Sequence, residues 1–418
     1  MSVSCGIDFG TTNSAAGISA PSSIPNLILL EGNHITLPSA LFFDTRKNSV
    51  HFGRAAGEMY LMGEDGRYMR SLKRILGTEL MGYHTQVGKQ VLKFDKIISL
   101  FLSNIKNKLD MHAKKNVEHV VMGRPVHFRT NDIEGDKRAQ NELEAIAKSI
   151  GFKHVEFQYE PIAAAFAHEE KLSAEKLACI IDIGGGTSDF TVIRLGPELK
   201  HNTDRTNDIL ANSGIMIGGN DFDKRFSIAS FMPILGRKTT YGAKLLTVPS
   251  SIYFELSEWS KINGAYASKH IAEAEEILSM SHSPSIYRRL VEVLHNNLGH
   301  KLLNTVENAK IDLTKQNHLE IQLDFLSDCP SVSICKQIFE DAIMKDVHQI
   351  DATLNECLTA AQIKPEQIEL IILTGGSTEI ELIQKRIKKK FPNAQIADTD
   401  KLSSVGLGLA YDAKRRFG

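Results

Sequence analysis

Two segments far apart in the chain carry the same arrangement of aspartate, glycine and threonine. They run from Gly6 to Ser14 and from Ile181 to Asp189, and apolar residues flank both. This pattern predicts a strand, a tight turn and a second strand. Glycine lets the backbone approach a ligand closely, and successive turn N–H groups can converge on an anion. One such turn is most simply an ordinary hairpin, but two copies indicate a pair of turns that grip a polyphosphate.

Each segment also places a carboxylate beside the expected phosphate. Asp8 and Asp182 stand where the first strand of each pair is expected to end. A carboxylate repels a phosphate, so the two residues favour a bridging divalent cation, which prefers oxygen ligands. The chemistry would then lie in a cleft between two lobes.

The composition is that of an ordinary globular protein. The chain has 418 residues, of which 42% are hydrophobic and 24% are charged, and its net charge is −1. This balance predicts neither a nucleic-acid surface nor a membrane surface. The basic run Lys385–Lys390 is expected to be the solvated face and last turn of a helix.

The cysteines and the N-terminus predict a cytoplasmic protein. Five cysteines without zinc-site spacing argue against a secreted disulfide framework. Cys5 and Cys179 stand just before the two turns and are expected to be buried strand residues. The chain begins without the basic and apolar regions of a signal peptide, and no apolar run approaches the ~20 residues that span a bilayer.

Hydrophobic periodicity predicts two α/β halves related by duplication. After the first hairpin we expect a strand at 117–122, a helix at 132–150, a strand at 155–159 and a helix at 163–169. The second half repeats the plan with a hairpin at 178–195, a strand at 370–373, a helix ending at 390 and a helix at 404–415. We predict lobe I at 1–177 with an inserted subdomain at about 44–115, and lobe II at 178–418 with an inserted helical subdomain at about 226–315.

These residues resemble a known family, the ATPase domain of the 70-kDa heat-shock (DnaK-type) chaperones, within the actin-like ATPase superfamily. The matching segments occur in family order over nearly the whole chain. They are Gly6–Ser14, Leu72–Gly77, Glu160–His168, Ile180–Ile193, Gly218–Phe226, Val306–Thr314 and Leu373–Ser377. The resemblance implies an α/β, actin-like (ribonuclease H-like) ATPase fold. The short length and the Gly123–Val126 variant are most like the short bacterial YegD-like chaperones.

The resemblance also implies roles for individual residues. Asp8 and Asp182 would hold Mg²⁺ through water, and Asp189 would be structural. The catalytic residues would be Lys73, Glu160, Asp182 and Thr187. The nucleotide-binding residues would be Gly10, Thr11, Thr12, Asn13, Gly184, Gly185, Gly186, Thr187, Gly218, Gly219, Glu307, Lys310, Thr314, Gly375, Gly376 and Ser377.

Three features depart from the family pattern. Ile311 and Glu379 stand where the family usually has two arginines that flank the adenine. Their loss puts recognition of the base in doubt without touching the phosphate site. The family's interdomain linker and peptide-binding domain would begin after Gly418, so we expect this chain to lack them.

We therefore predict a slow Mg-ATP hydrolase of the chaperone type that closes on ATP and reopens after hydrolysis. Its expected partners are ATP, ADP and a protein partner or co-chaperone, with no nucleic acid and no membrane. Three alternatives remain open. One is a small-molecule kinase of the same fold, and another is a nucleotide-sensing, partner-binding module with little turnover. The third is a filament-forming relative.

Overall fold

The computed structural model describes residues 3–202, 204–397 and 403–418. Its contacts group the chain into two compact units. Unit 1 contains the chain up to Gly219 together with Ile350–Glu379 and Ile383–Gly418, and unit 2 contains Asn220–Gln349 and Ile380–Leu382. Both predicted hairpins fall within unit 1. The division into lobes that was expected from the sequence stays a prediction.

The first sheet of unit 1 is built around the first hairpin. Its strand order is β11-β10-β1-β2-β3, and β4 also pairs with β2. β1 is antiparallel to β2 and parallel to β10, and β10 is parallel to β11. The strands are β1 (Ser4–Phe9), β2 (Asn13–Ser19), β3 (Asn26–Leu27), β4 (Thr36–Pro38), β10 (His119–Arg124) and β11 (His154–Tyr159).

The second sheet of unit 1 repeats this plan around the second hairpin. Its order is β14-β13-β12-β19-β20, with β12 antiparallel to β13, β19 parallel to β12, and β20 parallel to β19. The strands are β12 (Lys176–Ile183), β13 (Ser188–Leu195), β14 (Ile209–Ile215), β19 (Leu370–Thr374) and β20 (Gln395–Ile396). The repeated pairing confirms the duplicated α/β architecture expected from the sequence.

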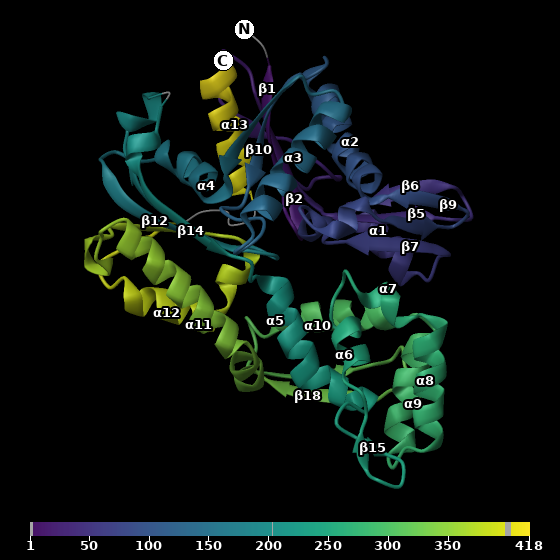
Figure 1. Cartoon of the computed structure of the whole chain (residues 1–418). Coiled ribbons are helices and arrows are strands. Elements are labelled where there is room, and N and C mark those ends of the chain that lie inside the picture. Colours follow the sequence, from purple (N-terminus) through teal and green to yellow (C-terminus); the bar gives the residue numbers. More distant parts are fainter. Residues whose placement is uncertain (1–2, 203, 398–402) are drawn as a thin grey trace. The chain divides into compact units, whose positions relative to one another are not determined.

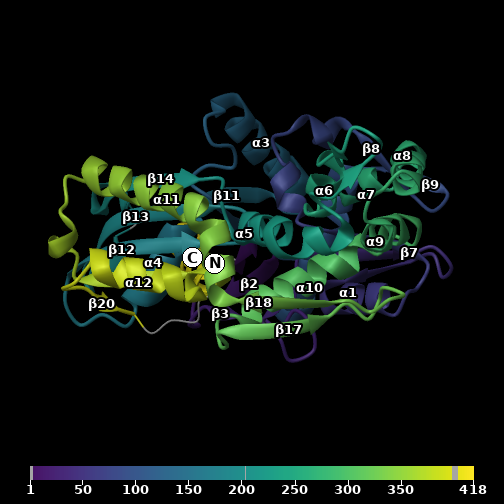
Figure 2. The same ribbon diagram turned by 90° about the horizontal axis from the view of Figure 1, so that it is seen from below.

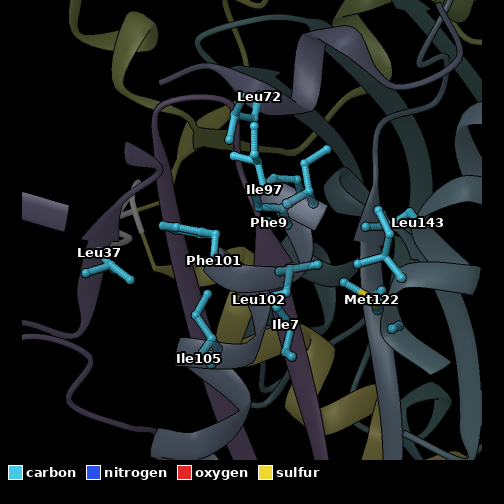
Figure 3. Packing of buried hydrophobic residues seen from close by; sticks show 14 of the residues in the cluster. Ile7, Phe9, Leu37, Leu72, Ile97, Phe101, Leu102, Ile105, Met122 and Leu143 are labelled. Atoms are coloured by element: carbon cyan, nitrogen blue, oxygen red, sulfur yellow. The ribbon is translucent and has the colours of Figure 1, made fainter. Parts of the chain in front are cut away.

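One face of the first sheet is covered by α2 (Phe94–Ala113) and α3 (Ile133–Ser149). Alternate residues of β1 point to this face because strand side chains alternate. Figure 3 shows Ile7 and Phe9 of β1 beside Phe101 and Leu102 of α2. The rings of Phe9 and Phe101 lie 5.7 Å apart. This packing anchors the strand that leads into the first turn.

The opposite face of the first sheet carries α13 (Ser404–Phe417) and α4 (Glu160–Glu169). Figure 1 shows α13 running beside β1 and β10 next to α4. A methyl group added at Gly6 would lie 2.4 Å from Ala410 N, and one at Gly17 would lie 2.8 Å from Ala410 Cβ. Gly6 and Gly17 are paired across the ladder, so a glycine pair lets α13 lie directly on the hairpin.

The second sheet lies between helices on both faces. α4 packs against β12 and β13, and Figures 1 and 2 show α11 and α12 along the opposite face. Cys357, in the part of α11 that belongs to unit 1, has its Sγ 3.6 Å from the Phe190 carbonyl oxygen. Cys5 and Cys179 are fully buried strand residues, as predicted. α11 spans Lys336–Ala360, and α12 spans Glu381–Lys390.

Unit 1 also contains smaller elements. A sheet of order β6-β5-β7 and a β8–β9 hairpin accompany α1 and several short 3-10 helices. The bounds are β5 (Ala40–Asp44), β6 (Ser49–Phe52), α1 (Gly53–Leu61), β7 (Gly66–Arg70), η1 (Leu72–Ile75), η2 (Glu79–Gly82), β8 (His84–Val87), β9 (Gln90–Lys93), η3 (Leu199–His201), η4 (Thr206–Asp208), η7 (Pro365–Gln367) and η8 (Gly376–Glu379).

Unit 2 is mainly helical, and its core contains Phe226, whose ring lies 5.5 Å from that of Phe231 and 5.1 Å from that of Phe339. Figures 1 and 2 show α8 and α9 side by side. The elements are α5 (Gly219–Phe226), the π-helix η5 (Ser227–Phe231), η6 (Met232–Leu235), β15 (Thr240–Tyr241), β16 (Leu246–Thr247), α6 (Ser251–Leu256), α7 (Ile262–Ala265), α8 (Ser268–Ser279), α9 (Pro284–His295), α10 (Gly299–Asp312), β17 (His318–Gln322) and β18 (Ser331–Cys335). Among the described residues, no helix is long and apolar enough to cross a bilayer.

Candidate functional site

The turns of the two hairpins face each other in unit 1. A methyl group added at Gly185 would lie 2.4 Å from Thr12 Cγ2, and one at Gly186 would lie 2.6 Å from Thr11 Oγ1. Glycine is therefore required where the second turn meets the threonines of the first. The close approach brings the hydroxyl and N–H donors of both turns to one place, as the duplicated motif predicted.

The first turn is held by a serine from outside the hairpin. Ser39 Oγ donates to the Gly10 carbonyl oxygen at 2.6 Å, and Ser39 N–H donates to the Thr12 carbonyl oxygen at 2.8 Å. These bonds occupy turn carbonyl groups. They fix the turn between β1 and β2.

The second turn is held by segments from later in the chain. Gly219 N–H donates to the Gly184 carbonyl oxygen at 2.9 Å, and Ser377 Oγ reaches the same oxygen at 3.3 Å. Gly375 has φ of +79°, and a methyl group there would lie 2.3 Å from the Ile183 carbonyl oxygen. A methyl group at Gly218 would lie 2.7 Å from Gly186 N. Gly218, Gly219 and Ser377 thus lie against the second turn.

A pocket opens between these turns. The predicted residues that line it are Asp8, Gly10, Thr11, Thr12, Asn13, Lys73, Glu160, Asp182, Gly184, Gly185, Gly186, Thr187, Gly375 and Gly376. Thr374 and Val405 also line it, and sequence reasoning missed them. Thr374 could have been found because it directly precedes Gly375.

Lys73 and Glu160 form a buried ion pair inside the pocket. Lys73 Nζ bonds to Glu160 Oε1, and each residue is 7% exposed. Lys73 comes from η1, and Glu160 is the first residue of α4, where the helix dipole favours a negative charge. Burial opposes the charged form of Lys73, but Glu160 and Asp8 outweigh it and raise the Lys73 pKa. Lys73 therefore carries a positive charge into the pocket at neutral pH.

The aspartates of both hairpins hold their protons more tightly than exposed aspartates do. Burial raises the pKa of Asp8 to about 7, and the charge of Glu160 adds to the shift. Burial raises the pKa of Asp182 well above its ordinary value, and Glu160 and Asp189 add to that shift. The pKa of Asp189 is raised to about 7, chiefly by burial and then by Glu160. Burial is the largest cause of all three shifts, and the charge of Glu160 adds to each of them.

The charges of the side chains that line the pocket are consistent with a bound divalent cation. The residues lining the pocket include three carboxylates, those of Asp8, Glu160 and Asp182, against one ammonium, that of Lys73. Carboxylate oxygens are the donors that Mg²⁺ uses, and Mg²⁺ commonly keeps several waters. Asp8 and Asp182 thus fit a hydrated ion. Among the described residues, no group of three or more His, Cys, Asp and Glu side chains is placed to hold a metal directly.

The residues expected on the adenosine side lie in unit 2. Glu307 and Lys310 are on α10, and Thr314 follows it. Lys310 Nζ lies 2.8 Å from Asp223 Oδ1 of α5, and Thr314 Oγ1 donates to the Ile311 carbonyl oxygen at 2.7 Å. Their contribution to a nucleotide site stays a prediction.

The family model and the relatives that match this chain all concern one family of proteins. A model of the Hsp70 protein family matches residues 4–233 and 291–414. The chain is 24% identical to the chaperone protein DnaK of Thermotoga petrophila over 421 residues, and 25% identical to that of Thermosipho melanesiensis over 419 residues. Each match covers 98% of this chain and 58% of the relative. The chain thus spans a little over half the length of these relatives.

Proposed function

The chain belongs to the Hsp70 protein family, and from this membership and the pocket geometry we propose that it binds Mg-ATP and hydrolyses it slowly. The family has the actin-like (ribonuclease H-like) ATPase fold, and the duplicated sheets of unit 1 have that architecture, so the predicted fold is confirmed. The observation that carries the proposal is the meeting of two glycine turns at a pocket that also contains Lys73, Glu160 and two aspartates.

In this proposal the turns bind the phosphates. Thr11, Thr12 and Thr187 offer hydroxyl donors, and the turn glycines expose backbone N–H groups without a side chain in the way. Donors that converge on one place bind a polyphosphate more strongly than a single donor does. The residues that would bind the adenosine moiety, Glu307, Lys310 and Thr314, stay a prediction from the sequence.

The reaction is attack of water on the γ-phosphorus. A P–O bond forms to the water oxygen, the bond to the bridging β-γ oxygen breaks, and ADP and phosphate leave. Lys73 stabilises negative charge on the phosphoryl oxygens, while Glu160 or Asp182 orients the water and accepts its proton. Bound Mg²⁺ would supply further charge neutralisation, with Asp8 and Asp182 holding its water shell.

The finer functional statements are also proposals. We infer a chaperone-type role in which the nucleotide state sets the affinity for a protein partner or co-chaperone. Such coupling is reciprocal, so the partner would shift the affinity for ATP. The cytoplasmic location and the likeness to the short YegD-like chaperones remain predictions from the sequence.

The test is single-turnover ATP hydrolysis by the purified chain, alongside titration of ATP binding with and without Mg²⁺. We expect Mg²⁺-dependent binding followed by slow release of phosphate. Tight binding with negligible hydrolysis would establish the nucleotide-sensing alternative instead. Hydrolysis replaced by phosphoryl transfer to an added sugar would establish the kinase alternative. Absence of ATP binding would overturn the proposal.

A further inference from the structure

The segment that carries Lys73 is held at its far end by two side chains of α3. Gly77 N–H donates to Glu142 Oε2 at 2.8 Å. The Gly77 carbonyl oxygen accepts from Arg138 Nη2 at 2.5 Å and from Arg138 Nε at 3.2 Å. Both main-chain polar groups of one residue are thus bonded to a single helix.

The backbone of Gly77 also fits closely against α3. Gly77 has φ of +73°, and a methyl group there would lie 2.2 Å from the Gly135 carbonyl oxygen and 3.0 Å from Ala139 Cβ. Arg138 and Glu142 are four residues apart, and so are Gly135 and Ala139, so each pair lies on one face of the helix. A strip of small residues receives the Gly77 backbone, and the two polar side chains fix its orientation.

The link between Gly77 and Lys73 is short and constrained. Lys73 lies in η1, and Leu76 N–H donates to the Lys73 carbonyl oxygen at 3.3 Å. The apolar side chains of Leu72 and Ile75 are buried in the same cluster as α2 and α3. Apolar burial is non-directional, whereas hydrogen bonds depend on angle. Apolar packing therefore holds the Leu72–Gly77 segment against the core, and the hydrogen bonds at Gly77 set the orientation of its backbone.

We propose that Arg138 and Glu142 are positioning residues that hold the Gly77 peptide and thereby set Lys73 in the pocket. The inference rests on the proposed ATPase function, because that function assigns Lys73 to the reaction. Small displacements of a catalytic group reduce the rate strongly, and Lys73 has little freedom to compensate because it is buried and paired with Glu160. Loss of the hydrogen bonding between Gly77 and either residue should therefore slow ATP hydrolysis more than it weakens ATP binding.

Two substitutions of Glu142 can separate its role as a hydrogen-bond acceptor from the effect of its negative charge. Burial raises the Glu142 pKa, although the Gly77 N–H and Arg138 favour the carboxylate. Glu142→Gln keeps an acceptor oxygen for the Gly77 N–H, whereas Glu142→Ala removes it. Glu144→Ala is the matched control, because Glu144 is on the same helix and pairs with Lys148 at 2.6 Å.

The experiment measures single-turnover hydrolysis and the ATP Kd for the full chain and these variants. We expect Glu142→Ala to lower the rate about ten-fold, an effect of the size that misplacement of a catalytic group produces. The ATP Kd should change less than about two-fold, since the phosphate donors are untouched. Glu142→Gln and Glu144→Ala should stay within about two-fold of the wild-type rate. Wild-type hydrolysis by Glu142→Ala would overturn the inference.

A double-variant cycle with Lys73→Ala distinguishes positioning from general destabilisation. If Glu142 acts through Lys73, Glu142→Ala should cost less than about two-fold in the Lys73→Ala background. An equal loss in both backgrounds would contradict the inference. Arg138→Met tests the same clamp through an exposed residue if Glu142→Ala does not fold. About a three-fold loss is expected, because the Gly77 carbonyl oxygen loses both hydrogen bonds from Arg138. A Lys73→Ala rate equal to wild type would instead count against the proposed ATPase function.

Discussion

The two hairpins share a backbone plan but have different electrostatic surroundings. In the first, Asp8 is paired across the ladder with Ala15. In the second, Asp182 is paired with Asp189. Residues paired across an antiparallel ladder lie on the same face and interact. The second hairpin therefore sets two carboxylates side by side, whereas the first has a single aspartate. Lys73 interacts with the aspartates of both hairpins.

The turns differ in a matching way. The first has one glycine followed by Thr11, Thr12 and Asn13, whereas the second has Gly184, Gly185 and Gly186 in succession. The first turn thus offers side-chain hydroxyl groups, whereas the second offers backbone N–H groups without side chains. Other segments of the chain approach this second turn closely. The two hairpins thus share the turn, but the second carries two paired carboxylates where the first carries one.

The largest expected effect is that of removing the cation beside the first hairpin. Lys73→Ala should slow single-turnover hydrolysis about 100-fold or more, the size of loss seen when one stabilising donor is removed from a transition state. ATP Kd should change little, because the charge that Lys73 meets grows during the reaction. Lys148→Ala, on the surface of α3, is the control. Equal losses in rate and binding would mean that Lys73 only anchors the bound nucleotide.

The next effect compares the two aspartates directly. A ligand at 100 times its Kd stabilises the native state by about 2.7 kcal/mol. Asp8→Asn and Asp182→Asn should each lose most of the Mg²⁺-dependent part of the ATP-induced melting shift, with Asp182→Asn losing more because its hairpin is the more negative. Thermal melts with ATP, with and without Mg²⁺, measure this. An unchanged Mg²⁺-dependent shift in both variants would contradict the metal site.

A smaller effect is the pH dependence of stability in the absence of nucleotide and Mg²⁺. Asp8 and Asp189 have native pKa values of about 7, against an ordinary value of 3.8. The native state therefore binds these protons more tightly, so their contribution to stability is full below about pH 4 and is lost as the pH rises through 7. Urea denaturation from pH 4 to 8 should show this decline.

Single substitutions show how much each hairpin contributes to the loss of stability with rising pH. Asp189→Asn should flatten it more than Asp8→Asn does, because Asp189 raises the pKa of Asp182 more than Asp8 does. Asp44→Asn is the control of opposite sign. The Asp44 pKa is lowered by the backbone N–H of Lys47 and then that of Arg46, so its contribution is lost only at acid pH. A slope unaltered by Asp8→Asn and Asp189→Asn would count against the charge asymmetry.

The smallest expected effect concerns the base, which neither hairpin contacts in this proposal. ATP and GTP share their phosphates, so their affinities should lie within about ten-fold of each other. Ile311, which is 48% exposed, and Glu379 replace cations that the resemblance places beside adenine, and neither offers cation–π attraction. Competition between ATP and GTP measures the ratio of the two affinities. Ile311→Arg should increase the preference for ATP. Strong ATP preference in the wild type would show that other groups recognise the base.

Much of the local structure could be predicted because its signals depend on near neighbours. The helix expected at 132–150 is α3, whose Asp132 cap accepts from Gly135 N–H at 2.8 Å. The helix expected to end at 390 is α12. By contrast, α11 had no prediction, although Phe339, Ile343, Val347 and Ile350 give it a buried stripe at helical spacing.

The sequence by itself determined the two turns and the family, since the glycine, threonine and aspartate positions that carry them are local properties. Only the tertiary structure decided that Lys73 meets Glu160, 87 residues away, and that α3 holds Gly77. Those contacts depend on how sheets and helices pack, and side-chain types alone do not specify packing partners. The raised aspartate pKa values follow for the same reason, because burial and neighbouring charge exist only once the chain has folded.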